Sequence, residues 1–168
     1  MQIKKVFRQE RKFLISGEQY YRFSRQFAEL FKEDSHNGKD GYMVRSLYFD
    51  TLGNKDFEEK LAGVECRRKM RLRIYSPQSR TAFLEMKQKQ GSNQLKRSLT
   101  ISREHAEELM KGYYEVLLEY SDPFATECYG VLKTNCYIPK VIVEYKRMAF
   151  VFKENDTRIT LSLIHISE

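Results

Sequence analysis

A run of alternating charged and apolar residues between Val64 and Lys89 constrains the fold more than any other part of the chain. Its two halves flank Ser76-Pro77-Gln78-Ser79, a turn sequence, and this pattern predicts two strands joined by a turn. Successive side chains on a strand point to opposite faces of the sheet. One face of the first strand therefore carries the cations Lys69, Arg71 and Arg73, followed by Tyr75. The other face carries Met70, Leu72 and Ile74.

The second strand continues the pattern. Its polar face holds Glu85, Lys87 and Lys89, which alternate with Leu84 and Met86. Like charges at two-residue spacing repel one another unless water or an anion separates them. A cationic strand face is typical of a solvated surface or of an anion-binding site, and these two strands alone leave both interpretations open.

Composition indicates a globular protein with an anionic partner. The chain has 168 residues, which suits one domain, and 41% of them are hydrophobic, which is too apolar for disorder. The formal net charge of +7 favours nucleic acid, an acidic membrane surface or a phosphate-rich small molecule as the partner.

Several classes of protein lack support in the sequence. No apolar run approaches the ~20 residues that span a bilayer, and the start, MQIKKVFRQERK, has no apolar signal-peptide core. We therefore expect a soluble cytoplasmic protein with reduced thiols at Cys66, Cys128 and Cys136. The three cysteines and three histidines show no zinc-ligand spacing, and the sequence contains no P-loop and no GxGxxG motif.

The N-terminal part predicts a strand, a helix, a second strand and a short helix. The first strand covers residues 3–15, with Arg8, Glu10 and Lys12 on one face. Ser16 and Gln19 form a capping box that starts a helix to Lys32, whose aromatic stripe suits core packing. A strand over 42–50 follows, and Asn54 is the expected cap of a helix over 55–61.

The remaining elements complete an α+β pattern. After the central strands we expect a strand over 94–101 with Lys96, Ser98 and Thr100 on one face. A helix over 103–111 capped by Ser102 and a helix over 123–135 that starts at Asp122-Pro123 follow, and then a long strand over 139–153 and a short strand over 156–161. The total of about seven strands and four helices favours an antiparallel α+β fold, in which barrel closure would remove the strand edges.

Six motifs in series resemble the VTC-type polyphosphate polymerase domain of the triphosphate tunnel metalloenzyme superfamily. They are RQERKF (8–13), VRSLYFD (44–50), KMRLRIY (69–75), FLEMK (83–87), EYKRMAF (144–150) and DTRIT (156–160). The resemblance implies an antiparallel β-barrel tunnel with flanking helices. It also implies transfer of the γ-phosphoryl group of a nucleoside triphosphate such as ATP to inorganic polyphosphate.

The resemblance carries site residues with it. The catalytic residues would be Lys12, Arg71, Arg73 and Lys87. Further phosphate-binding residues would be Arg8, Lys69, Arg147 and Arg158. A divalent metal, manganese or magnesium, would assist the transfer, and Glu10 and Glu85 are the carboxylates available to hold it. Arginine forks bind phosphate oxygens through two hydrogen bonds at once, and carboxylates suit hard divalent ions.

The end of the chain departs from the family pattern. The family continues beyond the DTRIT-like strand with further strands that carry a metal-binding glutamate and a tunnel lysine. We therefore expect residues 1–160 to form a VTC-like domain whose C-terminal part is missing, so that the barrel is incomplete, and residues 161–168 to be a non-native tail.

Three alternative functions stay open. The same fold could act as a non-catalytic polyphosphate-binding module, or as an inorganic triphosphatase of the same superfamily. A nucleic-acid-binding domain fits least, because exposed stacking aromatics would accompany its basic residues and most aromatics here have core spacing.

Overall fold

The computed structural model describes residues 11–91, 93–152, 154 and 157–165. The chain divides into two compact units, and each is described by itself. The central unit comprises residues 46–142, and the terminal unit comprises the described residues of 9–45 and 143–168. Strands β2 (Tyr42–Thr51) and β6 (Tyr137–Phe152) contribute residues to both units.

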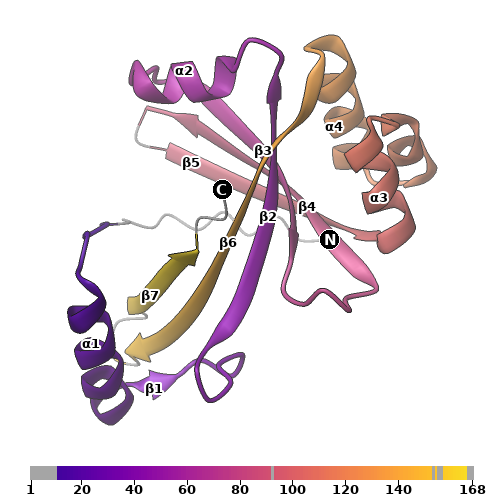
Figure 1. Ribbon diagram of the computed structural model, residues 1–168. Helices are drawn as coiled ribbons and strands as arrows, with labels where there is room; N and C mark the ends of the chain where they lie inside the picture. The colour runs from indigo at the N-terminus through magenta and orange to yellow at the C-terminus, as the bar shows by residue number, and fades with distance from the viewer. Residues whose placement is uncertain (1–10, 92, 153, 155–156, 166–168) are drawn as a thin grey trace. The chain divides into compact units, whose positions relative to one another are not determined.

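The central unit is built on four neighbouring strands in the order β2-β3-β4-β5 (Figure 1). Strands β3 (Arg67–Ile74), β4 (Thr81–Gln90) and β5 (Asn93–Ser102) pair antiparallel. The predicted turn between β3 and β4 is confirmed, since the Ser79 amide donates to the Ser76 carbonyl at 3.1 Å. The register places Met70 opposite Met86 and Leu72 opposite Leu84, so the apolar residues of both strands share one face.

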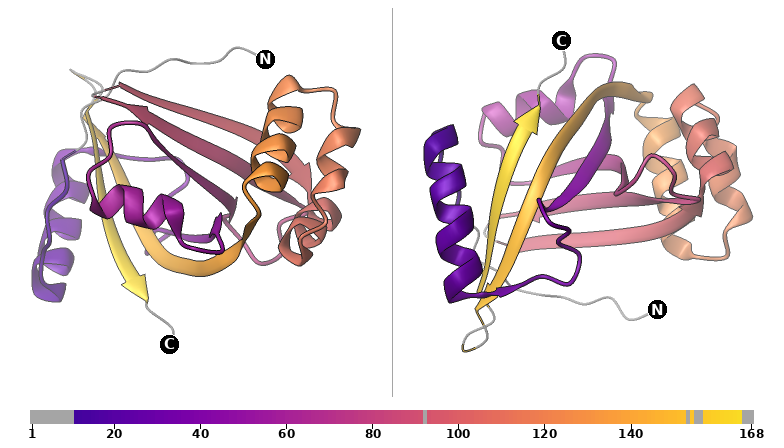
Figure 2. Two further views of the ribbon diagram at one scale, coloured as in Figure 1. Left: turned by 90° about the horizontal axis from the view of Figure 1, so that it is seen from above. Right: turned by 60° about the horizontal axis from the view of Figure 1, so that its bottom comes forward.

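Helices cover that apolar face. They are α3 (Arg103–Lys111), the 3₁₀ helix η1 (Tyr114–Glu119) and α4 (Pro123–Thr134), and α3 and α4 lie beside each other in Figures 1 and 2. Leu109, Leu117 and Leu132 are fully buried in the same core as the apolar residues of β3 and β4. Burial of such side chains stabilises the unit by roughly 1.5–3 kcal/mol each. Cys128 lies in this core, and all three cysteines are free thiols.

In the central unit, two of the three predicted helix caps are confirmed. Ser102 caps α3 and Asp122 caps α4, whose first residue is Pro123. Asn54 occupies the predicted cap position of α2 (Lys55–Leu61), but the predicted side-chain capping bond is wrong, because Asn54 adopts φ 58° and makes no capping hydrogen bond with its side chain. Asp50 replaces it: its carboxylate accepts the amides of Asp56 at 2.9 Å and Phe57 at 3.0 Å.

The terminal unit packs a helix on strands. Helix α1 (Gly17–Leu30) begins with the predicted capping box of Ser16 and Gln19. Strand β6 pairs antiparallel with β1 (Lys32–Glu33) and β7 (Thr157–His165). The aromatic stripe of α1 packs against Phe150 and Leu161, which confirms its predicted core role, and Figure 2 shows α1 alongside β7.

Two predicted segments differ from the structure. The strand over residues 3–15 is wrong for residues 11–15, which form no strand, and residues 3–10 lie outside the described chain. The side chains of Phe13 and Leu14 are 80% and 102% exposed, so alternation there buries no apolar face. The last strand is longer than predicted and runs to His165, while the domain boundary at residue 160 stays a prediction. No helix within the described chain is both long and apolar enough to cross a membrane.

Candidate functional site

The register of three strands gathers the cations predicted from the alternating run. Arg71 lies opposite Glu85 on β4, and Glu85 lies opposite Ser98 on β5. One step along the same face, Lys69, Lys87 and Lys96 lie side by side across β3, β4 and β5. Strand alternation puts all of these side chains on the face opposite the apolar core. The predicted cationic face is therefore present in the central unit.

A buried carboxylate stands at the centre of this face. Glu85 is 4% exposed, and its Oε2 lies 2.7 Å from Arg71 Nε and 3.0 Å from Arg73 Nη2. Its Oε1 lies 2.6 Å from Lys96 Nζ. We call these four residues, Arg71, Arg73, Glu85 and Lys96, the Glu85 cluster. Three cations surround one carboxylate, so the cluster keeps an excess of positive charge that favours an anionic ligand.

Two tyrosines hold the guanidinium groups in place. Arg71 Nη1 donates to the Tyr48 hydroxyl at 2.9 Å, and Arg73 Nη1 donates to the Tyr75 hydroxyl at 3.0 Å. Each guanidinium also lies near the face of its tyrosine ring, at 5.7 Å for Arg71 and 5.8 Å for Arg73. Burial opposes the charged form of Arg71, but Tyr48 and Glu85 raise its pKa above the ordinary value, so the side chain stays cationic.

Arg73 retains an unused donor. Its side chain is 7% exposed, and its Nε is buried without a hydrogen-bond partner within the described residues. A buried donor without an acceptor costs about 1–3 kcal/mol, so such groups are kept where a ligand or water supplies the acceptor. The Nε–H of Arg73 could therefore donate a hydrogen bond to an oxygen of a bound ligand.

The predicted metal role of Glu85 fits poorly with its surroundings. Both of its carboxylate oxygens already contact cations, and a metal ligand would have to leave them. Within the described part of the chain, no three His, Cys, Asp or Glu side chains lie close enough together to hold a metal ion. Glu10, the second predicted metal ligand, lies outside the described residues, as does Arg8.

The other predicted site residues belong to the terminal unit. Arg147 donates to the Tyr145 hydroxyl at 2.8 Å, and its Nε is a second buried donor without a partner in the described chain. Arg158 pairs with Asp34 at 2.9 Å. Lys12 is exposed and lies outside any helix or strand. The convergence of these three residues with the Glu85 cluster stays a prediction.

Lys96 and Tyr48 were not predicted as site residues, and Tyr75 was predicted only as a member of the cationic face. Lys96 contacts Glu85 directly, and Tyr48 and Tyr75 orient the two arginines. Lys96 lies on the polar face predicted for its strand, and the short turn at Gly91 places that strand beside β4. Pairing β5 with β4 across that turn would have identified the lysine, whereas no local pattern pairs Tyr48 with Arg71.

Two solved structures are similar to this one in fold. A candidate adenylate cyclase from Bacillus halodurans shares 16% identity at a TM-score of 0.65, with 93% of this chain and 72% of that chain covered. A candidate adenylyl cyclase from Hippeastrum, for which a dominant triphosphatase activity is described, shares 17% identity at a TM-score of 0.62, covering 90% and 70% of the two chains.

These likenesses confirm the predicted fold class, an antiparallel α+β fold of the incomplete tunnel-barrel type with flanking helices. No curated protein matches the chain significantly in sequence. The model of the VTC domain matches residues 7–163, nearly the whole chain, so the protein belongs to the VTC domain family.

Proposed function

We propose that the chain binds nucleoside triphosphate and inorganic polyphosphate on its cationic face and acts as a polyphosphate polymerase-type phosphotransferase. The Glu85 cluster carries this proposal, because it combines three cations around one buried carboxylate, preset arginine geometry and the orphan donor of Arg73. Family membership supports it, and the cytoplasmic location expected from the sequence belongs to the same proposal.

The chemistry of the reaction suits this arrangement. Phosphoryl transfer depends mainly on positioning and on neutralising charge, with little covalent help from the protein. Arg71 and Arg73 would hold phosphate oxygens through their forks, while Lys69, Lys87 and Lys96 would act as point charges along the chain of phosphates. Lys12, Arg147 and Arg158 would extend the phosphate contacts. Glu85 would keep the forks aligned between turnovers.

A divalent metal, manganese or magnesium, belongs to the proposal through the family alone. Such an ion would neutralise charge on the phosphates. Because Glu85 is engaged by three cations, we expect the phosphate oxygens and residues other than Glu85 to supply its ligands.

Binding is tested by thermal shift with tripolyphosphate at low salt. A ligand that binds only the folded state raises the melting temperature, and salt weakens a mainly electrostatic effect. The Arg71→Gln variant should lose most of the shift. Arg103→Gln is the matched control, because Arg103 lies on the outer helix α3 and pairs with Glu107 at 2.9 Å. Equal shifts in both variants would remove the Glu85 cluster from the binding site.

The product decides between polymerase and triphosphatase, the second candidate that the Hippeastrum structure favours. With ATP and manganese, a polymerase gives polyphosphate and ADP. A triphosphatase instead releases inorganic phosphate from tripolyphosphate without making polymer. Tight binding with neither product would identify a binding module. Displacement of tripolyphosphate by a single-stranded oligonucleotide at equal concentration would favour a nucleic-acid-binding domain.

A further inference from the structure

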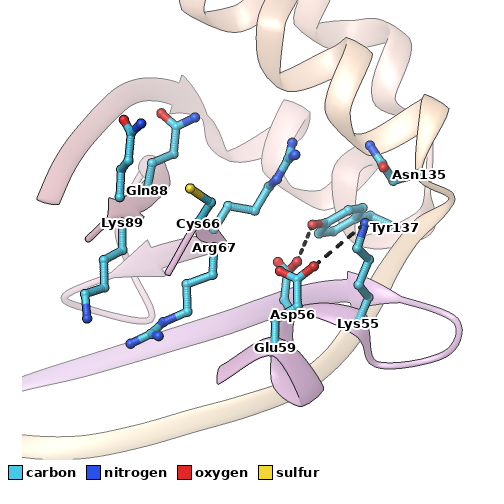
Figure 3. Close-up of a pocket in the computed structure, with 11 residues that line it drawn as sticks. Lys55, Asp56, Glu59, Cys66, Arg67, Gln88, Lys89, Asn135 and Tyr137 are labelled. Atoms are coloured by element: carbon cyan, nitrogen blue, oxygen red, sulfur yellow. Dashed lines mark hydrogen bonds and ion pairs between the residues drawn. The ribbon is translucent and has the colours of Figure 1, made fainter. Parts of the chain in front are cut away.

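The central unit contains a cavity that the proposed phosphate chemistry does not use. Its volume is about 390 Å³, within the usual range of small-molecule sites. Helix α2 supplies Asp56 and Glu59 to its lining, the facing ends of β3 and β4 supply Arg67 and Lys89, and the start of β6 supplies Tyr137 (Figure 3).

Asp56 gives the cavity an acceptor that nothing in the described chain uses. The residue is 5% exposed, and its Oδ1 accepts a hydrogen bond from the Tyr137 hydroxyl at 2.7 Å. Its Oδ2 is buried and has no hydrogen-bond partner within the described residues. Buried carboxylate oxygens are normally satisfied, so this oxygen calls for a donor from a ligand or from water.

The opposite side of the cavity is basic. Arg67 and Lys89, which lie opposite each other on β3 and β4, contribute positive charge there. Arg68 also lines the cavity but acts electrostatically on Asp56, and the amides of Gln88 and Asn135 complete the lining. The lining also contains Lys55 and Glu59, whose opposite charges form an ion pair with an Nζ–Oε1 distance of 3.8 Å. The cavity therefore joins a carboxylate acceptor on the α2 side to Arg67 and Lys89 on the strand side, and Figure 3 shows Asp56 on one side and these two cations on the other.

We propose that this cavity is a second ligand site, for a small organic anion with hydrogen-bond donors at the end away from its charge. Acidic amino acids and nucleoside monophosphates share this chemistry. The donor end binds Asp56 Oδ2, and the anionic end binds Arg67 and Lys89. The site shares no residue with the Glu85 cluster, although Arg67 and Lys89 lie on the same strand face, and the proposal stands whether or not the chain makes polyphosphate.

The charge state of Asp56 makes ligand binding depend on pH. Burial, with Asp50 and Glu59 nearby, raises the pKa of Asp56 to about 6, and the Tyr137 hydrogen bond and Arg68 partly oppose the rise. Above that pKa both oxygens accept, and a donor-bearing ligand binds. Below that pKa the carboxyl group is protonated, so Oδ2 carries a hydrogen and can no longer accept a hydrogen bond from the ligand's donor. Binding should therefore weaken between pH 7.5 and pH 5.

Cys66 provides the readout, because it is exposed and lines the cavity. Cys136 is exposed outside the lining residues and serves as the internal reference. The experiment measures iodoacetamide labelling of both cysteines by peptide mass spectrometry, with L-glutamate, AMP, GMP or inorganic phosphate added. At about twice its dissociation constant, a true ligand slows Cys66 labelling about threefold and leaves Cys136 unchanged. Glutamate or a nucleotide should protect, whereas phosphate, which lacks the distal donors, should not.

Asp56→Asn is the decisive variant. Its Oδ1 can still accept from Tyr137, but an NH₂ group replaces the Oδ2 acceptor, so protection should be lost while the melting temperature does not fall. Arg67→Gln removes one of the cations proposed to bind the anionic end of the ligand and therefore tests that contact. Ligand-detected NMR at pH 7.5 and pH 5 tests the titration without relying on any variant.

Three results would overturn the second site. The first is that no probe protects Cys66 at about 10 millimolar, a concentration that would reveal even very weak binding. The second is that Cys66 is protected equally in Asp56→Asn and in the wild-type protein. The third is that phosphate alone protects Cys66. None of these results concerns tripolyphosphate binding, which is tested by the thermal shift of the Arg71→Gln variant. Failure of one proposal is thus distinguishable from failure of the other.

Discussion

Arg71 donates its Nε hydrogen to Glu85 at 2.7 Å, and the two residues lie directly opposite each other on paired strands. The ion pair is therefore tied to the strand register. A slip of one residue would place Arg71 opposite a core methionine or leucine and send every charge to the apolar face. The same contact that prepares the anion site also specifies how β3 and β4 align.

Neutralising Glu85 should destabilise the central unit. Glu85→Gln leaves Arg71, Arg73 and Lys96 without their shared anion, and breaking a buried ion pair from one side costs about 3–5 kcal/mol. Urea unfolding at low salt measures the loss, and added tripolyphosphate should restore part of it. The exposed Glu107→Gln control should change stability by less than about 0.5 kcal/mol. A Glu85→Gln protein as stable as wild type would show that the cluster is not a folding constraint.

Lys87→Gln should weaken phosphate binding in a salt-dependent way. Lys69, Lys87 and Lys96 face one another across three strands, so each contributes to the field felt by a bound polyanion. Loss of one charge should reduce both the affinity for tripolyphosphate and the slope of log affinity against log salt. Isothermal titration at several salt concentrations measures both quantities. An unchanged slope would place the polyanion elsewhere.

Asp50, rather than Asn54, should control the stability of α2. Asp50→Ala removes the acceptor of the Asp56 and Phe57 amides, and loss of such a cap costs about 1–2 kcal/mol. Asn54→Gly is the matched comparison, because glycine tolerates the φ of 58° and no side-chain bond is lost. Its unfolding free energy should stay close to the wild-type value. A larger loss in Asn54→Gly than in Asp50→Ala would reverse the assignment.

Asp56 should make the domain less stable as pH rises. Its pKa is raised in the folded state from 3.8 to about 6, so the folded protein favours the protonated form. The stabilisation is present below pH 4 and is lost as pH rises through 6. Asp56→Asn lacks this dependence. Its stability relative to wild type should increase between pH 4 and pH 7.5 by on the order of 2–3 kcal/mol. Parallel stability curves for the two proteins would contradict the raised pKa.

Cys128 should be chemically silent in the native protein. Burial raises the pKa of its thiol to about 12, whereas Cys66 and Cys136 are exposed. Because the thiolate is the reactive form, native alkylation should modify Cys66 and Cys136 only. Denaturant should release the third site. Rapid native labelling of Cys128 would show that the core around α4 opens readily.

Regular patterns made most of the fold predictable from the sequence. The period of two along β3 and β4 fixed both their faces, and the caps at Ser16, Ser102 and Asp122 placed three helix starts correctly. The predicted strand at residues 11–15 was wrong because alternation is informative only where one face is apolar. The predicted capping bond of Asn54 was wrong because the fold brings another acceptor, Asp50, to the same amides.

The site was predictable to the extent that one strand pair contains it. Arg71, Arg73 and Glu85 follow from alternation and a short turn, and they lie together as expected. Tyr48 comes from a different strand, and its contact with Arg71 depends on strand order, which no local pattern specifies. The cavity beside α2 could not be predicted from local patterns either, because Asp56 and Tyr137 are 81 positions apart in the chain.

The way α2 is attached leaves its sequence unusually free to change. Asp50 holds the first turn of the helix through main-chain amides, which every residue except proline provides. Substitutions at Lys55, Asp56 or Glu59 can therefore alter what the cavity recognises without detaching the helix from β2. A domain with this architecture can acquire a different ligand in this cavity by changing a few side chains of α2, while the strands that carry the arginines stay unchanged.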